Sequence, residues 1–327
     1  MDWLKRVDVW CFGRGRPESM GLLRVLCGFF VFTNLLVMGT DLMNYFGQKG
    51  FVSGETMARW LAYPSNKIFY GSSLEMTLPF SMPRISVIGP NSSDTWVVTV
   101  WVCSLILSLC FMLGFKARFT GVLLALGMTS LHLRNPLIIH AGDSLLRLFV
   151  IYLALGHSSA AFSLDRLFEA RRGLAQRAVS LWPQRLIQIQ IAICYVLTAW
   201  WKWTGSTWVD GTATWYSSQL HEFDRFPVPD FVKQQPFVGL TTYGTLLVEV
   251  ALGTLVFYPP ARKWVLLSGI ALHSYIEYSF NIPFFATTIV SGYIAFYQGE
   301  EVAGWLHRFK DRWLKRGTLT SDAASEV

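Results

Sequence analysis

Charged side chains are scarce in this 327-residue chain, in which Asp, Glu, Lys and Arg make up 15% of the residues. Soluble domains carry about 25%, so this composition argues against a soluble globular fold. Hydrophobic residues reach 52%, and the 14 tryptophans suit aromatic belts at the two interfaces of a membrane. The net charge of +7 comes from Lys and Arg in short segments between apolar runs, so we expect topology determinants and no nucleic-acid partner.

The sequence also lacks the motifs of several common site chemistries. Its five cysteines lie mostly in apolar runs and form no CxxC pair, so we interpret them as small packing residues. No P-loop, GxGxxG or GxSxG motif is present, and no HxxxH or ExxH pair falls on one predicted helix. We therefore expect no metal site. Residues 1–19 are polar, and no small-residue cleavage pattern follows the next apolar run, so we expect no cleavable signal peptide.

Long apolar runs occupy most of the chain. A helix needs about 20 such residues to cross a bilayer. The sequence predicts an all-α, polytopic transmembrane helical bundle with about eight spans, at residues 20–39, 95–114, 118–134, 143–160, 186–203, 239–258, 264–280 and 283–299. The third, fourth, seventh and eighth are short or interrupted, so some of them could be re-entrant or buried segments.

The distribution of Lys and Arg predicts the orientation of this bundle. With eight spans, 18 of these residues fall on one side, 7 on the other and 3 within spans. Basic residues favour the cytoplasmic side, so both termini are predicted to be cytoplasmic. The predicted organisation is a cytoplasmic segment at 1–19, a transmembrane domain at 20–300 and a basic cytoplasmic tail at 301–327. The basic loop 161–185 is interpreted as either an interfacial helix or a plain connector.

Ionisable residues within the predicted spans gather near the outer, non-cytoplasmic face. Charges in spans are unfavourable and usually mark function. The residues near this face are Arg134, Asp143, Arg147, Lys202, His273 and Glu277, while Glu249 lies near the middle of the sixth span. Because a carboxylate in mid-span must be neutral or paired, we expect Glu249 or Asp143 to pair with Lys202. Asp143 and Arg147 share one helix face and could also pair.

Each of these residues also has a structural interpretation. Lys202 stands among Trp200, Trp201 and Trp203, as a lysine does when it extends to the interface. Arg134 and Arg147 could be interfacial anchors, and His273 could be a hydrogen-bonded residue of the bundle. Arg24, near the inner end of the first span, is predicted to extend to the interface.

Two blocks of sequence resemble the horizontally transferred transmembrane (HTTM) domain, the membrane domain of the vitamin K-dependent gamma-carboxylase family. The first comprises Leu131-His132-Leu133-Arg134-Asn135-Pro136, the stretch from Ala141 to Leu148 that contains Asp143 and Arg147, and Ser163-Leu164-Asp165-Arg166. The second comprises Gln188, Gln190, Tyr195, Lys202, Trp208 and Asp210-Gly211-Thr212-Ala213. Glu249 and His273 match the last spans of the family, and the resemblance covers about residues 15–300.

The resemblance implies a role for several residues. In the carboxylase, a lysine beside the Trp-Gly block is the base that deprotonates reduced vitamin K, and Lys202 takes this position. His273, Asp143 and Glu249 are further catalytic candidates, and Arg134, Asn135, Arg147 and Trp208 are candidates for substrate binding. The sequence departs from the carboxylase at Trp201-Lys202-Trp203, where the carboxylase has two adjacent lysines, and at Asp143, where it has a histidine. We also expect no counterpart of the carboxylase's large lumenal domain.

Three functions follow as hypotheses for a multi-pass protein of a bacterial inner membrane. The first is an enzyme that acts on a quinone or lipid-like substrate by lysine-based proton abstraction, with a reduced, vitamin K-like quinone as the implied cofactor. The second is a non-enzymatic accessory protein for maturation or export of a secreted peptide. The third is a small-molecule transporter, which the lack of an inverted repeat disfavours.

Overall fold

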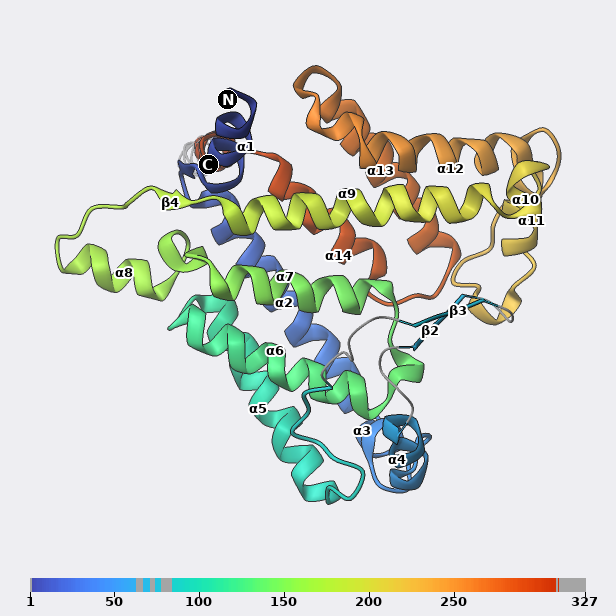
Figure 1. Cartoon of the computed structure of the whole chain (residues 1–327), viewed down its shortest axis with the longest axis horizontal. Coiled ribbons are helices and arrows are strands. Elements are labelled where there is room, and N and C mark those ends of the chain that lie inside the picture. The colour runs from blue at the N-terminus through green and yellow to red at the C-terminus, as the bar shows by residue number, and fades with distance from the viewer. Residues whose placement is uncertain (1, 63–66, 71–73, 78–83, 310, 312–327) are drawn as a thin grey trace, which may run out of the picture. The chain divides into compact units, whose positions relative to one another are not determined.

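The computed structural model describes residues 2–62, 67–70, 74–77, 84–309 and 311. It is predominantly helical and forms two compact units (Figure 1). One unit contains residues 1–23 and 156–327, and the other contains residues 24–155. The predicted all-α class is confirmed, because the strands among the described residues form only two short antiparallel pairs. Residues 312–327, which make up most of the predicted basic tail, lie outside the described residues.

The unit of residues 24–155 holds most of α2 and the helices that follow it. Its elements are α2 (Glu18–Gly39), α3 (Leu42–Phe46), α4 (Gly54–Ala62), β2 (Lys67–Tyr70), β3 (Leu74–Thr77), α5 (Asp94–Leu113), α6 (Ala117–Arg134), the 3-10 helix η1 (Pro136–Ile138) and α7 (Ala141–Leu155). In the core, α5 packs against α6 and α6 against α7. Gly28 lets α2 approach the backbone of α5, because a Cβ there would lie 2.6 Å from the Cα of Met112.

The unit of residues 1–23 and 156–327 contains the remaining long helices. Its elements are α1 (Asp2–Phe12), β1 (Arg14–Gly15), η2 (Ser158–Ala160), α8 (Leu164–Arg171), β4 (Val179–Ser180), α9 (Trp182–Trp203), α10 (Ser206–Val209), α11 (Ala213–Ser217), η3 (His221–Phe223), η4 (Asp230–Lys233), α12 (Phe237–Gly253), η5 (Leu255–Phe257), α13 (Pro259–Ser279), α14 (Phe285–Gly292) and η6 (Tyr293–Phe296). Here α12 packs against both α9 and α13, and β1 pairs with β4. The helix expected in loop 161–185 is α8, whose first turn is capped by the side chain of Ser163.

All eight predicted apolar segments are helical over most of their length. Within the described part of the chain, α2 and α5 are long and apolar enough to cross a membrane. The helix α12 and residues 285–296 are apolar but shorter. The number of spans and the side on which each terminus lies therefore remain predictions.

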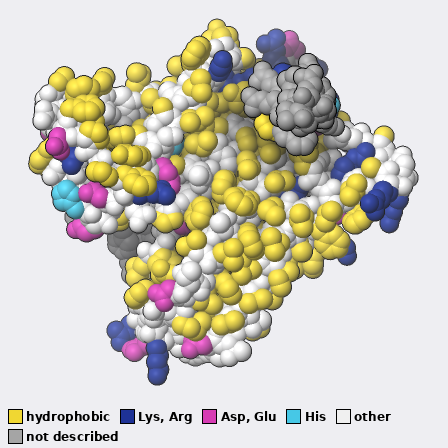
Figure 2. Space-filling view, turned by 180° about the vertical axis from the view of Figure 1, so that it is seen from behind, with side chains coloured by type: hydrophobic (Ala, Val, Ile, Leu, Met, Phe, Trp, Pro, Cys, Tyr) yellow, Lys and Arg dark blue, Asp and Glu magenta, His cyan; other side chains and the backbone are white. Residues whose placement is uncertain are grey.

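Large apolar side chains lie on the surface of these helices. Leu240 and Leu247 of α12 are 67% and 72% exposed, and Trp200 of α9 is 64% exposed. Figure 2 shows hydrophobic side chains over much of one face. Extensive exposed apolar surface is typical of a protein that contacts a membrane or a partner.

The prediction that Arg24 extends to the interface was wrong, because its side chain is fully buried. Its Nη1 donates hydrogen bonds to the carbonyl oxygens of Phe111 at 2.6 Å and Met112 at 2.5 Å. These carbonyls belong to the last turn of α5, where backbone acceptors lack helical partners and the helix dipole attracts a cation. The sequence indicated where Arg24 lies along its own span, but it could not indicate that the C-terminal end of α5 packs beside it.

Candidate functional site

Lys202 forms the centre of a polar cluster in the unit that contains α9. It lies in the last turn of α9, where its Nζ forms an ion pair with Oε1 of Glu249 from α12. The Lys202 side chain is 27% exposed, whereas that of Glu249 is 9% exposed. The sequence offered Asp143 and Glu249 as partners for Lys202, and the structure pairs it with Glu249. The Lys202 side chain is thus partly accessible to solvent, whereas that of Glu249 is almost entirely buried.

The ring of Trp208 lies beside the amine of Lys202. Its ring centroid lies 5.0 Å from the Nζ of Lys202, a distance suited to a cation–π contact. A tight turn places it there: the backbone N–H of Gly205 donates to the carbonyl of Lys202 at 2.9 Å, and α10 begins at the next residue. The hydroxyl of Tyr243 on α12 then holds α10 by a 2.8 Å bond to the carbonyl of Val209. The Lys–Trp–Gly block of the sequence therefore folds as a local unit around the amine.

A second set of polar groups meets at Tyr195, about two turns before Lys202 on α9. The hydroxyl of Tyr195 bonds to Nε2 of His273 at 2.7 Å and to the hydroxyl of Tyr293 at 2.6 Å. All three side chains are buried and come from α9, α13 and η6. Tyr195 belonged to the quoted resemblance, but Tyr293 carried no sequence signal, because a tyrosine in an apolar run is common.

Two buried polar atoms of these residues have no hydrogen-bond partner among the described residues. They are Oε2 of Glu249 and Nδ1 of His273. Buried polar atoms are nearly always satisfied, and exceptions often mark a site that a ligand or water completes. This observation and the partly exposed amine make the Lys202 cluster the leading candidate site.

Asp143 and Arg147, which could pair by their spacing, do not pair in the unit of residues 24–155. Oδ1 of Asp143 accepts a 2.9 Å bond from Asn34, and its Oδ2 accepts a 3.1 Å bond from the backbone N–H of His140. Arg147 instead lies 3.4 Å from Nδ1 of His132. Asp143, Asn34 and His132 also line a small cavity of about 10 Å³, which is close to the space that one water needs.

Arg134 and Asn135 are placed by the structure within a buried junction. Both are fully buried. Arg134 donates to the carbonyls of Val52 at 2.6 Å and Gly47 at 2.5 Å, and Asn135 donates to that of Tyr45 at 2.9 Å. These bonds fix the segment that follows α3, so they give the Arg-Asn-Pro block a structural role. Direct contact of Arg134 or Asn135 with a substrate remains a prediction.

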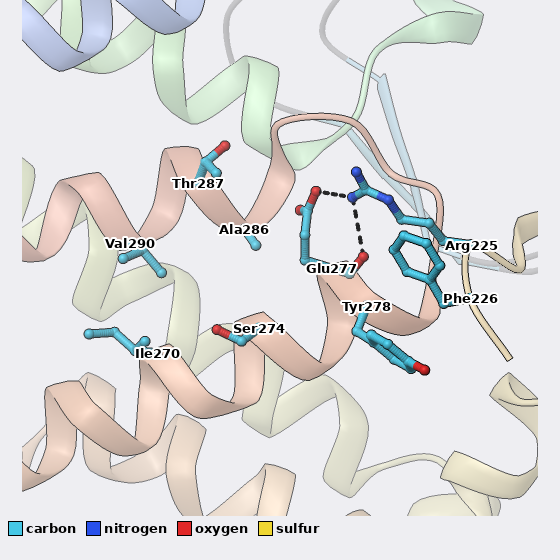
Figure 3. A pocket seen from close by; sticks show the side chains of 9 residues that line it. All are labelled: Arg225, Phe226, Ile270, Ser274, Glu277, Tyr278, Ala286, Thr287 and Val290. Carbon is cyan, nitrogen blue, oxygen red and sulfur yellow. Dashed lines mark hydrogen bonds and ion pairs between the residues drawn. The ribbon is translucent and has the colours of Figure 1, made fainter. Parts of the chain in front are cut away.

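A larger cavity of about 440 Å³ lies beside α13 and α14 (Figure 3). Its lining includes Arg225 and Glu277, which form an ion pair. Glu277 was predicted to lie near the outer face, but the cavity itself was not predicted. Within the described residues, no group of three or more His, Cys, Asp or Glu residues is arranged to hold a metal ion.

A lysine–glutamate pair inside an apolar helical bundle is the arrangement expected of a membrane protein with a functional site between its helices. The chain belongs to the HTTM domain family, whose family model matches residues 66–300. The family and the two long apolar helices indicate a membrane protein.

One curated relative is the uncharacterized protein YitO of Bacillus subtilis (strain 168). It is 29% identical over 182 residues, which are 53% of this chain and 57% of the relative. The chain therefore spans a little over half of the length of this relative. No solved structure matches the chain.

Proposed function

We propose that this chain is a multi-pass protein of a bacterial inner membrane with both termini in the cytoplasm. In this proposal it uses Lys202 to take a proton from a lipid-soluble substrate at the outer face. The observation that supports the role of Lys202 most directly is its position. Its amine is partly exposed beside Trp208, while the carboxylate paired with it is almost entirely buried.

The ion pair itself offers a route to an amine that can accept a proton. A lysine acts as a base only when it is neutral, and burial reduces the free-energy difference between the charged pair and the pair of neutral partners. Transfer of one proton from Nζ of Lys202 to Oε1 of Glu249 leaves a neutral amine and a neutral carboxyl group. The amine then takes the proton of an acidic O–H of the substrate. The products are an ammonium ion and a substrate anion, which attract each other.

A reduced, vitamin K-like quinone fits these residues as the substrate or cofactor. Such a molecule would present a phenolic O–H to Lys202 and a flat ring to the aromatic side chains nearby. Trp208 lies next to the amine, with its ring centroid 5.0 Å from Nζ. When bound, the quinone would supply the acidic proton and the redox chemistry. Lys202 would accept the proton, and Glu249 would set the charge of Lys202.

The test compares wild-type protein with Lys202→Met in lipid nanodiscs supplied with vitamin K hydroquinone in air. Ionised hydroquinones oxidise faster than neutral ones, so the wild type should accelerate loss of the hydroquinone absorbance over protein-free nanodiscs. Lys202→Met should reduce the rate to the background, while Lys116→Met, which removes a lysine outside the cluster, should leave it unchanged. Equal rates for wild type and Lys202→Met would reject the base role.

A second candidate function is an accessory protein for a secreted peptide. The segment between α9 and α12 supports it, because Trp215, Tyr216, Phe223 and Phe231 are each 42–55% exposed. Aromatic side chains of this kind are enriched where proteins bind peptides. Deletion of residues 220–233 should then remove one or more peptides from the secreted fraction, measured by mass spectrometry, whereas Lys202→Met should not. A secreted fraction unchanged by the deletion would contradict this proposal.

A further inference from the structure

The 440 Å³ cavity beside α13 and α14 has the features of a binding site for a small molecule. Pockets that bind such molecules typically measure roughly 300–1,000 Å³ and combine apolar walls with a few polar groups. The apolar part of this wall consists of Phe226, Ile270, Ala286 and Val290. In Figure 3, α13 and α14 contribute Ile270 and Val290 toward one end of the cavity, while Arg225 and Glu277 lie together at the other.

The polar end of the cavity offers both a hydrogen-bond acceptor and hydrogen-bond donors. Nη1 of Arg225 pairs with Oε1 of Glu277 and also donates to its backbone carbonyl at 3.3 Å. Both bonds use Nη1, and the described residues give the Nε and Nη2 groups of Arg225 no other partner, so these groups remain as donors. Oε2 of Glu277 is buried and has no hydrogen-bond partner among the described residues. The other oxygen, Oε1, pairs with Arg225 and can accept a further hydrogen bond, because each carboxylate oxygen has two lone pairs.

The position of Arg225 is fixed by the backbone around it. Its N–H donates to the carbonyl of Ser279 at 3.1 Å, and the preceding Asp224 forms a β-bridge with Phe280. The ring of Phe226 then lies 5.3 Å from that of Tyr278. The polar end is therefore built from a segment joined to the end of α13, and its geometry does not depend on a single flexible side chain.

We propose that this cavity binds a single-chain aliphatic molecule whose head is an uncharged hydroxyl group. The hydroxyl hydrogen would donate to the carboxylate of Glu277, whose side chain is 26% exposed, and the hydroxyl oxygen would accept a bond from Arg225. Because Arg225 already neutralises Glu277, a cationic head is not required, and a carboxylate head would face the carboxylate of Glu277. The apolar wall selects a hydrocarbon chain. The site is separate from the Lys202 cluster and does not depend on the chemistry proposed there.

The experiment uses full-length protein in nanodiscs and a photoreactive decanol that carries a diazirine in the middle of its chain. After illumination, mass spectrometry of peptides locates the adducts. We expect adducts in residues 270–290, and we expect unlabelled 1-decanol to compete with them. The methyl ether of decanol lacks the hydroxyl hydrogen, so about tenfold more of it should be needed for the same competition, as for loss of one hydrogen bond to a charged group.

Two variants with the same substitution separate binding in the cavity from general partition into lipid. Val290→Trp narrows the apolar end of the cavity and should sharply reduce the adducts. Leu267→Trp lies on α13, at a residue that is 45% exposed and does not line the cavity, and it should leave them unchanged. Adducts that persist in Val290→Trp would overturn the site. Equal competition by decanol and its methyl ether would overturn the proposed hydroxyl recognition.

Discussion

Replacing Lys202 by methionine should destabilise the protein more than replacing its partner Glu249 by leucine. Methionine keeps the length of the side chain but removes the cation, and the carboxylate of Glu249, with only 9% of its side chain exposed, loses its ion-pair partner. Breaking a buried ion pair in this way costs about 3–5 kcal/mol. The reverse variant leaves Lys202, whose side chain is 27% exposed and can extend to water.

The magnitude can be expressed as a change in thermal unfolding. For a chain of this size, 1 kcal/mol lowers the unfolding midpoint by about 2 °C, so Lys202→Met should lower it by roughly 6–10 °C. Glu249→Leu should lower it by less. The double variant Lys202→Met/Glu249→Leu leaves no unpaired charge and should recover most of the loss, because apolar pairs often replace buried ion pairs without penalty.

The assay is thermal unfolding of the purified protein in one detergent, followed by intrinsic fluorescence, for the wild type, both single variants and the double variant. The double-mutant cycle isolates the interaction between the two side chains. If the losses of the two single variants simply add in the double variant, the ion pair contributes nothing and the assignment of Glu249 as the partner fails.

Two further predictions address the segment after α3 and the topology. Arg134→Leu leaves the carbonyls of Gly47 and Val52 without their donor. Loss of two bonds from a charged donor should lower the free energy of unfolding by about 3–6 kcal/mol and speed proteolysis after α3. A variant as resistant to protease as the wild type would contradict the buried junction. The topology is tested in a variant without native cysteines, in cells whose outer membrane is permeable but whose inner membrane is sealed. A membrane-impermeant maleimide should label Gln219→Cys but not Arg172→Cys. Labelling of both would reject the proposed orientation.

The amino-acid sequence was sufficient for the positions of the helices. Each of the eight predicted segments is helical over most of its length, because the hydropathy of a run is a local property. The Lys-Trp-Gly block was also predictable, since Lys202 in the last turn of α9 and Trp208 in α10 are close in the chain and meet through local backbone bonds. Charged residues in apolar runs likewise pointed to Glu249 and His273, since a polar group in such a run is rare unless it has a partner.

The partners of those residues required the tertiary structure. Spacing along one helix favoured a pair between Asp143 and Arg147, yet each bonds elsewhere, because side chains from other segments compete with an i, i+4 neighbour. The same reason applies to Arg24, which caps the carbonyls at the end of α5.

The sequence by itself determined which residues of this protein enter an apolar helix and which of them carry polar groups. Only the tertiary structure decided that Lys202 meets Glu249, 47 residues away in the chain, and that Tyr195 joins His273 to Tyr293. It also decided that Arg225 and Glu277 form the polar end of a cavity. Hydropathy depends on each residue and its neighbours in the chain, whereas these contacts depend on how distant helices pack, and packing is set by the side chains of all of them together.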